Sequence, residues 1–353
     1  MANYPQLDNS SGVWNLREVY DAVMGGYWPN ANSIAVIAHG RTGDKLLEKI
    51  TISTSGNATL FGDATIKKTY IGQAGMGSFT RGIYAGGASP SYLNTIDYIT
   101  FSTEGNAADF GDCTTTRDNS GAGSNSVRGV IAGGYTTPAR INVIDYITMA
   151  STGNASDFGD LTVARNEIAP MFSPTRGVFA GGRTPTVVNT IDFVEIATTG
   201  NSTDFGDLSV ATATAGGTSS SVRGIAGGGF SPSITSVVQF ITLASQGNAT
   251  NFGNLTVARQ TTSATSNSVK AVYSGGEAPA LTNTIDQIVI NNGGTGTDFG
   301  DLLMADDALA SASNSHGGLN DGYQGTRPIP FQEAGGDRGL LGGGNGTVTD
   351  IQS

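Results

Sequence analysis

Paired aspartates recur along this sequence at a constant separation, and they are the residues best placed to do chemistry. The element DFGD carries two carboxylates and follows an Asn by a few residues; its pairs are Asp109 with Asp112, Asp157 with Asp160, Asp204 with Asp207, and Asp298 with Asp301. Oxygen-rich turns can bind Ca²⁺, but the ion needs six to eight oxygen ligands, and one such turn offers fewer. Asp and Asn also stabilise turns through their own backbone. We therefore interpret the pairs as structural and expect no metal and no cofactor.

Charged residues of both signs also recur, in two neighbouring strands of the repeat. A basic residue opens a strand that ends in Gly-Gly, at Arg81, Arg128, Arg176, Arg223, Lys270 and Arg338. The next strand carries an acid at Asp97, Asp145, Asp192 and Asp286, with Glu48 in the first unit and Gln239 as the exception. A ring of cations around a channel could hold an anion. Because every unit keeps the pattern, we favour a structural ladder of Arg–Asp pairs.

Motifs for catalysis are absent from the sequence. The two histidines, His39 and His316, lie in different kinds of segment, which does not suggest a metal centre. There is no GxSxG, no GxxxxGK[ST] and no HExxH. We expect a protein that is not an enzyme; two turn aspartates that converge in space are the remaining catalytic alternative.

Composition excludes several classes of partner. The net charge of −11 disfavours nucleic acid and anionic membranes, since both need clustered Lys and Arg. Cys113 is the single cysteine, so no disulfide forms within the chain. The first residues lack the basic and apolar regions of a signal peptide, and no apolar run is long enough to span a membrane. We expect a soluble chain without a standard secretory signal.

A unit of about 47 residues organises the whole sequence. The Phe of the DFGD element recurs at Phe110, Phe158, Phe205, Phe252 and Phe299. In the unit 161–207, strands are predicted at 161–165, within 166–175, at 176–182 and at 189–196. Four strands per repeat and a period of 40–50 residues predict an all-β fold, the β-propeller, in which each unit is one blade.

The order of these elements resembles the kelch repeat. The shared features are Arg165, the pair Gly181 and Gly182, Asp192, and Phe205 with Leu208. Kelch units usually carry Trp where this chain has the Phe of DFGD. The resemblance implies kelch-like four-stranded blades, but the departure argues against transferring the function of kelch adaptor proteins.

The blade count has two interpretations. The Gly-Gly strand occurs seven times between residues 34–40 and 338–344, and Trp14 stands one period before Phe61. We prefer seven blades, with the ring closed by N- and C-terminal strands at 12–16, 338–344 and 347–352. The alternative is six blades, with a short helix at 16–26 outside the ring. We divide the chain into a closure and docking segment, 1–33, and a propeller, 34–353, with a long loop insertion at 307–337.

The loops that follow Gly-Gly vary between repeats. Each keeps a proline, at Pro90, Pro138, Pro185, Pro232 and Pro279. Their variable residues are Tyr92, Tyr135, Arg140, Arg183, Phe230 and Glu277. We expect these loops to gather on one face of the disc, where stiff loops with aromatic and charged residues suit recognition of a protein or a glycan. Neutral drift of loop residues is the alternative.

Two strings together resemble virion structural proteins of tailed bacteriophages, notably marine ones. They are the repeat RGVFAGG…NTIDFVEI…DFGDLTVAR and the opening SGVWNLREVYDAVMGGYWP at 11–29. The resemblance implies a particle component of tail, neck or capsid surface, made in the host cytoplasm and released by lysis, with other virion proteins as partners. We expect Trp14, Leu16, Tyr20 and Trp28 to make the docking contact. The alternatives are a protein that binds a host receptor or surface glycan and, less favoured, a glycan-active enzyme.

Overall fold

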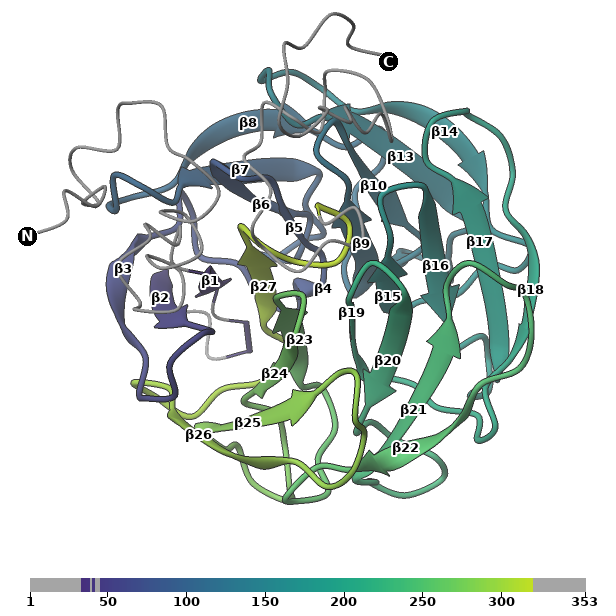
Figure 1. Cartoon of the computed structure of the whole chain (residues 1–353). Coiled ribbons are helices and arrows are strands. Elements are labelled where there is room, and N and C mark those ends of the chain that lie inside the picture. Colours follow the sequence, from purple (N-terminus) through teal and green to yellow (C-terminus); the bar gives the residue numbers. More distant parts are fainter. Residues whose placement is uncertain (1–32, 39, 42–44, 320–353) are drawn as a thin grey trace, which may run out of the picture.

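The computed structural model describes residues 33–38, 40–41 and 45–319, and this part of the chain is all-β, with no helix. Its strands form six four-stranded antiparallel sheets arranged around a central axis, as in a β-propeller (Figure 1). Inner strands of neighbouring sheets are in contact all the way round, so the ring is closed.

The blades are named 1 to 6 in chain order, each with its strands given from the axis outwards. Blade 1 consists of β27 (Ala310–Ser313), β1 (Ile34–Ala38), β2 (Leu46–Thr51) and β3 (Thr59–Asp63). Blade 2 consists of β5 (Gly75–Gly77), β6 (Arg81–Ala85), β7 (Thr95–Thr100) and β8 (Ala108–Asp112). Blade 3 consists of β9 (Ser120–Ser124), β10 (Arg128–Ala132), β13 (Val143–Thr148) and β14 (Ser156–Asp160). Blade 4 consists of β15 (Ala169–Phe172), β16 (Arg176–Ala180), β17 (Thr190–Glu195) and β18 (Thr203–Asp207). Blade 5 consists of β19 (Gly216–Ser219), β20 (Arg223–Gly227), β21 (Val237–Thr242) and β22 (Thr250–Asn254). Blade 6 consists of β23 (Ser263–Ser266), β24 (Lys270–Ser274), β25 (Thr284–Val289) and β26 (Thr297–Asp301). Two short additions are β4 (Gly72–Gln73), parallel to β9, and the hairpin β11 (Tyr135–Thr136) with β12 (Ala139–Arg140).

Ring closure differs from the preferred prediction. The described residues form six blades, the alternative count, and seven are not confirmed. Blade 1 takes its inner strand from β27, which pairs with β1 so that Ala35 faces Ser313 and Ala38 faces Ala310. The segment 307–337, expected to be a loop insertion, therefore begins with a regular inner strand. The closing strands predicted at 12–16, 338–344 and 347–352 lie outside the described residues.

The second strand of each blade is almost entirely buried, because it lies between two strands of its own sheet and between the sheets of two neighbours. In β16 every residue after Arg176 is buried, and the other second strands share this pattern. In the outer strands β8 and β18 the Phe of DFGD is buried, whereas the two residues before it are exposed. The Phe also meets an aromatic of the third strand, as in the edge-to-face pair of Phe193 and Phe205. The cores therefore lie between blades, which ties each blade to the next.

The outer edge of each blade is covered by a turn of the next blade. Gly153 and Ala155 donate backbone hydrogen bonds to Phe110 and Asp112 of β8, at 2.7 and 2.8 Å. The side chain of Asn154 accepts a bond from the Asp112 amide at 3.1 Å. The same contacts join blade 1 to blade 6, where Gly56 and Ala58 donate to Phe299 and Asp301. Sheet edges that would otherwise recruit foreign strands are thus already paired.

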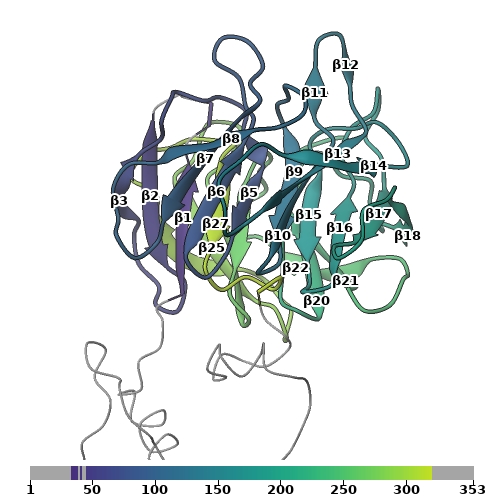
Figure 2. The ribbon, with the colours of Figure 1, turned by 90° about the horizontal axis from the view of Figure 1, so that it is seen from above.

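The disc has two distinct faces. The loop face carries the five proline loops (88–94, 135–142, 183–189, 230–236 and 277–283), and β11–β12 stands away from the body of the disc there (Figure 2). The turn face carries the turns that join the first and second strands of each blade. Both ends of the described chain lie at the turn face, where the Asn314 amide donates to the Ile34 carbonyl at 3.1 Å.

Candidate functional site: the channel and the loop face

Buried ion pairs recur in the blades, but their bases do not come from the segment that the sequence predicted. Arg165 Nη1 lies 2.7 Å from Asp192 Oδ2, and both side chains are fully buried. Arg117 with Asp145, Arg259 with Asp286 and Lys68 with Asp97 repeat the arrangement at 2.6, 3.2 and 3.1 Å. These bases lie in the link that leads from one blade into the next, and not at the start of the Gly-Gly strand. The pairing predicted with Arg81, Arg128, Arg176 and Arg223 is therefore wrong.

Three acids of the ladder, Asp145, Asp192 and Asp286, also accept a hydrogen bond from a backbone amide of the link. Asp192 accepts hydrogen bonds from the Thr162 amide at 3.2 Å and from Thr162 Oγ1 at 2.7 Å. Blade 5 loses both charges together, because Thr212 and Gln239 occupy the two positions. There Gln239 accepts from Ser209 and Val210 and donates to the Val210 carbonyl. The ladder is thus a hydrogen-bonding frame that works with or without charge.

The strand-opening arginines connect neighbouring blades near the turn face. Arg176 Nη1 donates to the carbonyls of Leu243 and Ala244, at 3.1 and 2.9 Å. Its guanidinium lies 5.0 Å from the centre of the Phe193 ring. Arg81, Arg128 and Arg223 make equivalent contacts. Because no Arg or Lys is among the described residues that line the channel, these residues do not form a cation ring that could hold an anion there.

The turn aspartates of DFGD do not converge. They lie on the outer strands of separate blades, and within the described residues no three His, Cys, Asp or Glu side chains group as metal ligands. The Asn that precedes three of the four pairs holds the neighbouring blade, as in the bond from the Asp160 amide to Asn201 Oδ1 at 3.0 Å. The recurring Asn and Asp thus serve the joint between blades.

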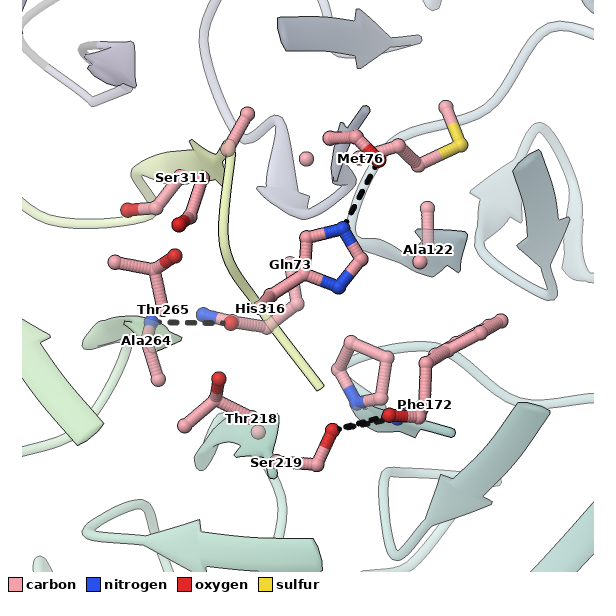
Figure 3. Close-up of a pocket in the computed structure, with 17 residues that line it drawn as sticks. Gln73, Met76, Ala122, Phe172, Thr218, Ser219, Ala264, Thr265, Ser311 and His316 are labelled. Atoms are coloured by element: carbon pink, nitrogen blue, oxygen red, sulfur yellow. Dashed lines mark hydrogen bonds between the residues drawn. The ribbon is translucent and has the colours of Figure 1, made fainter. Parts of the chain in front are cut away.

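The central channel is filled by side chains of the chain itself. Its inner strands are rich in Gly, Ala, Ser and Thr and carry no charged residue. Gln73 Nε2 donates to the Thr262 carbonyl at 2.6 Å, and the Ala264 amide donates to Gln73 Oε1 at 3.3 Å, so this side chain crosses the channel (Figure 3). His316 projects into the same space (Figure 3). The remaining cavity of about 40 Å³ has room for a few water molecules and no organic ligand.

Neither Gln73 nor His316 was singled out as a channel residue from the sequence. A signal for Gln73 exists, because blade 2 has two more residues than the others between the link and the first turn. Tyr70 precedes Ser78 by eight residues, whereas Asn119 precedes the equivalent Asn125 by six. The extra residues form β4 and bring Gln73 to the axis.

A closed ring of backbone hydrogen bonds surrounds the loop-face end of the channel. One residue per blade adopts a left-handed conformation, with φ between 47° and 60°: Tyr70, Asn119, Glu167, Thr214, Thr261 and Ala308. The amide of each donates to the carbonyl of the one before, from Ala308 back to Tyr70, at 2.8 to 3.1 Å. The Gly72 amide closes the ring on the Ala308 carbonyl at 3.3 Å. A positive φ is costly for Thr, so the ring compensates for local strain.

The loop residues proposed for binding gather on the loop face, as predicted. Tyr92 and Tyr135 pack edge to face with ring centres 5.6 Å apart. Arg183 donates to Glu167 at 2.9 Å and lies over the Phe230 ring at 5.6 Å. Arg140 donates to Asn166, and Glu277 pairs with Arg41. All six are half-buried and contact neighbouring loops. The exposed surface consists instead of small residues at the loop tips: Pro90, Ser91, Thr137, Pro138, Ala139, Pro185, Thr186, Pro232, Ser233, Pro279 and Ala280.

The loop face also holds a buried carboxylate. Asp118 is 8 % exposed, and its Oδ1 has no hydrogen-bond partner among the described residues. Burial raises the pKa of Asp118 to about 6, although a hydrogen bond from Asn119 opposes the shift. The nearby Glu167 adds to the rise. This face therefore gains negative charge as the pH rises through about 6.

The docking residues Trp14, Leu16, Tyr20 and Trp28 lie outside the described residues. The described part of the chain contains no helix long and apolar enough to cross a membrane. Comparison of the sequence with protein-family models and with curated proteins finds no match.

Proposed function

We propose that this chain is a non-enzymatic structural component of a tailed-phage particle, in which the propeller is a rigid docking and display module. The observation that supports it best is the separation of the two faces. The chain enters and leaves the described fold at the turn face, next to Ile34 and Leu319. The variable proline loops lie on the opposite face. Segments 1–32 and 320–353 can therefore attach the disc while the loop face remains free for a partner.

The joints between blades support a role that needs rigidity. Buried pairs such as Arg165 with Asp192, the ring of amides at Tyr70 to Ala308, and the covered outer edges each bond one blade to its neighbour. Gln73 adds a bond from blade 2 to blade 6, which are not direct neighbours in the ring. A module of this kind presents its loops in a constant arrangement, so binding costs little ordering of the chain.

The test is quantitative mass spectrometry of purified particles from phage lysate, scaled to the major capsid protein. We expect a constant integral copy number per particle. Small multiples of three, six or twelve indicate tail or neck, and many dozens of copies indicate capsid decoration. Absence of the chain from purified particles would contradict the proposal and move the protein to the class of free binding proteins.

The second candidate is recognition of a host receptor or surface glycan by the loop face. The specific observation in its favour is the cluster of Tyr92, Tyr135 and Phe230, which stiffens the loops beneath their exposed tips. The glycan-active enzyme is a lesser proposal, because the DFGD aspartates of the described residues lie on the outer strands of separate blades.

Substitution at the loop tips distinguishes recognition from attachment alone. Because Ser91, Thr186 and Ala280 are exposed and their side chains pack against nothing, Arg at all three should leave the melting temperature unchanged. If the loop face binds the host, we expect cell binding measured by flow cytometry to fall at least about tenfold, since bulky charges disrupt a contact surface. The control is Ser151→Arg, on an exposed turn at the turn face. Equal binding of both variants and the unmodified chain would remove the recognition candidate.

A further inference from the structure

One short loop closes the turn-face end of the channel. Residues 314–319 follow β27 of blade 1 and contact three other blades. His316 Nε2 lies 2.9 Å from the Gly77 carbonyl of blade 2 and 3.3 Å from Ser124 Oγ of blade 3. The Gly317 amide donates to the Ser219 carbonyl of blade 5 at 3.0 Å. The loop thus joins four blades across the axis, and His316 is the only long side chain among its polar contacts.

Close backbone packing fixes the path of this loop. A Cβ added to Gly318 would lie 1.8 Å from the Ser124 carbonyl oxygen, and one added to Gly317 would lie 2.3 Å from the Ser220 backbone. The loop therefore rests directly on the ends of the inner strands. Leu319, at its end, is 6 % exposed.

The hydrogen bonds of His316 are compatible with one protonation state. Gly77 offers a carbonyl, which can only accept, so Nε2 carries a proton. The Gly318 amide donates to Nδ1 at 3.2 Å, so Nδ1 carries none. Ser124 Oγ donates to the same Gly77 carbonyl at 2.7 Å and accepts from the Gly77 amide at 3.1 Å. Ser124 therefore cannot transfer its proton to the ring, which excludes a Ser–His nucleophile here.

Protonation of the ring would remove the bond to Gly318. A proton on Nδ1 would face the N–H of Gly318, turning an attractive contact into a repulsive one. Among the described residues, the six inner strands β5, β9, β15, β19, β23 and β27 offer no acidic or basic side chain to stabilise the charge. The other residues of the loop are Asn314, Ser315, Gly317, Gly318 and Leu319, which are also uncharged.

We propose that residues 314–319 are an acid-sensitive latch, in which neutral His316 holds the turn-face end of the channel closed and protonated His316 releases it. His316 is half-buried at the end of the channel. Release would uncover the Ser- and Thr-lined channel and free the point from which residues 320–353 continue. This goes beyond attachment and display, and it does not depend on which partner the loop face binds.

The direction of the pH dependence follows from burial, which lowers the pKa of His316 to about 4, although the bond to Gly77 opposes the shift. A histidine whose pKa is lowered by closure favours the closed state above its ordinary pKa of 6.5. This preference is lost as the pH falls from 6.5 to about 4. Between pH 7.5 and 4.5 the equilibrium constant for opening should rise about 70-fold.

The experiment is hydrogen exchange of the peptide that covers residues 311–319, corrected for the intrinsic pH dependence of exchange. In the unmodified chain, protection of Gly317 should fall about 70-fold from pH 7.5 to pH 4.5. The variant His316→Gln keeps a donor for Gly77 and an acceptor for Gly318 but does not titrate. Its protection should not change with pH. A peptide from β16, Arg176–Ala180, serves as the internal control for global unfolding.

A second measurement does not depend on the variant being well folded. The chain has two histidines, so its imidazole NMR spectrum contains two sets of signals, and the set missing from His316→Gln belongs to His316. We expect this ring to titrate near pH 4 as the neutral Nε2–H form. A titration midpoint at 6 or above, or unchanged protection of residues 311–319 at pH 4.5, would overturn the proposal.

Discussion

Replacing Arg165 by Thr, or Asp192 by Gln, should each lower the free energy of unfolding by about 3–5 kcal/mol, because each single change leaves a fully buried charge without its partner. The double variant Arg165→Thr/Asp192→Gln should cost only about 1–2 kcal/mol. It reproduces in blade 4 the pair Thr212 and Gln239 that blade 5 carries at the same positions.

The hydrogen bonds that remain in each variant explain this difference in stability. Asp192 accepts from the Thr162 amide and hydroxyl, and Gln239 accepts in the same way from Val210 and Ser209. The Gln in the double variant therefore keeps the link to blade 4 in place. The Thr removes the buried cation that Gln could not neutralise. What is left is the cost of a smaller side chain in the space of an arginine.

The measurement is urea unfolding monitored by circular dichroism. The midpoint and slope of the transition are compared between the unmodified chain, the two single variants and the double variant. The prediction requires a coupling energy of about 4 kcal/mol or more between the two positions. Additive losses, with the double variant the least stable, would show that the two charges contribute independently of each other and would contradict the prediction.

Gly159→Ala should destabilise the protein by about 3 kcal/mol or more, although it adds a single methyl group. Gly159 of the DFGD element has φ of +146°, a conformation that other residues avoid. Its added Cβ would lie 2.4 Å from the carbonyl oxygen of Gly200, which belongs to the turn of the next blade. That turn cannot move away, because its Gly200 amide donates to the Phe158 carbonyl at 2.7 Å and Asn201 is bonded to Asp160.

Gly200→Ala is the matched control, since it places the same methyl group on the other side of the same contact. A Cβ at Gly200 meets no atom within 4 Å, and this residue is exposed. The free energy of unfolding of the Gly200→Ala variant should differ from that of the unmodified chain by less than about 1 kcal/mol. Thermal unfolding of both variants compares them directly. Similar melting temperatures would show that the joint between blades is soft and that the outer turns do not hold the ring together.

The fold class was predictable because repetition is visible without knowledge of any contact. The second and third strands, such as RGVFA and TIDFVE, have apolar patterns that demand burial on both sides, and four strands per unit follow from the spacing. The preferred prediction of seven blades was not confirmed, because it did not recognise the inner strands. ASAS and SATS are too small and polar to be recognised as strands, so Ala310–Ser313 was assigned to a loop and the ring was counted from Gly-Gly strands.

The candidate site was predicted in part. That the six loop residues share a face follows from their equal place in every blade. Their half-buried positions do not, because Arg183 and Phe230 come from adjacent loops and meet only when the blades stack. The buried bases show the same limit. A base equivalent to Arg81 and a base equivalent to Arg165 both recur in nearly every unit. Recurrence alone does not indicate which of the two pairs with the acid of the third strand, Asp97 in blade 2 or Asp192 in blade 4.

Local patterning thus determined the repeat, its four strands, the all-β class and the gathering of the proline loops, because strand and turn formation depend on neighbouring residues. Folding around the ring decided the number of blades, the partner of each buried charge and the contents of the channel. These depend on contacts between residues 47 to about 280 positions apart, such as Gly77 with Ser124 and Ile34 with Asn314. Gln73 and His316 fill the channel for the same reason. Each reaches a strand on another blade, and such a contact leaves no periodic signal in the chain.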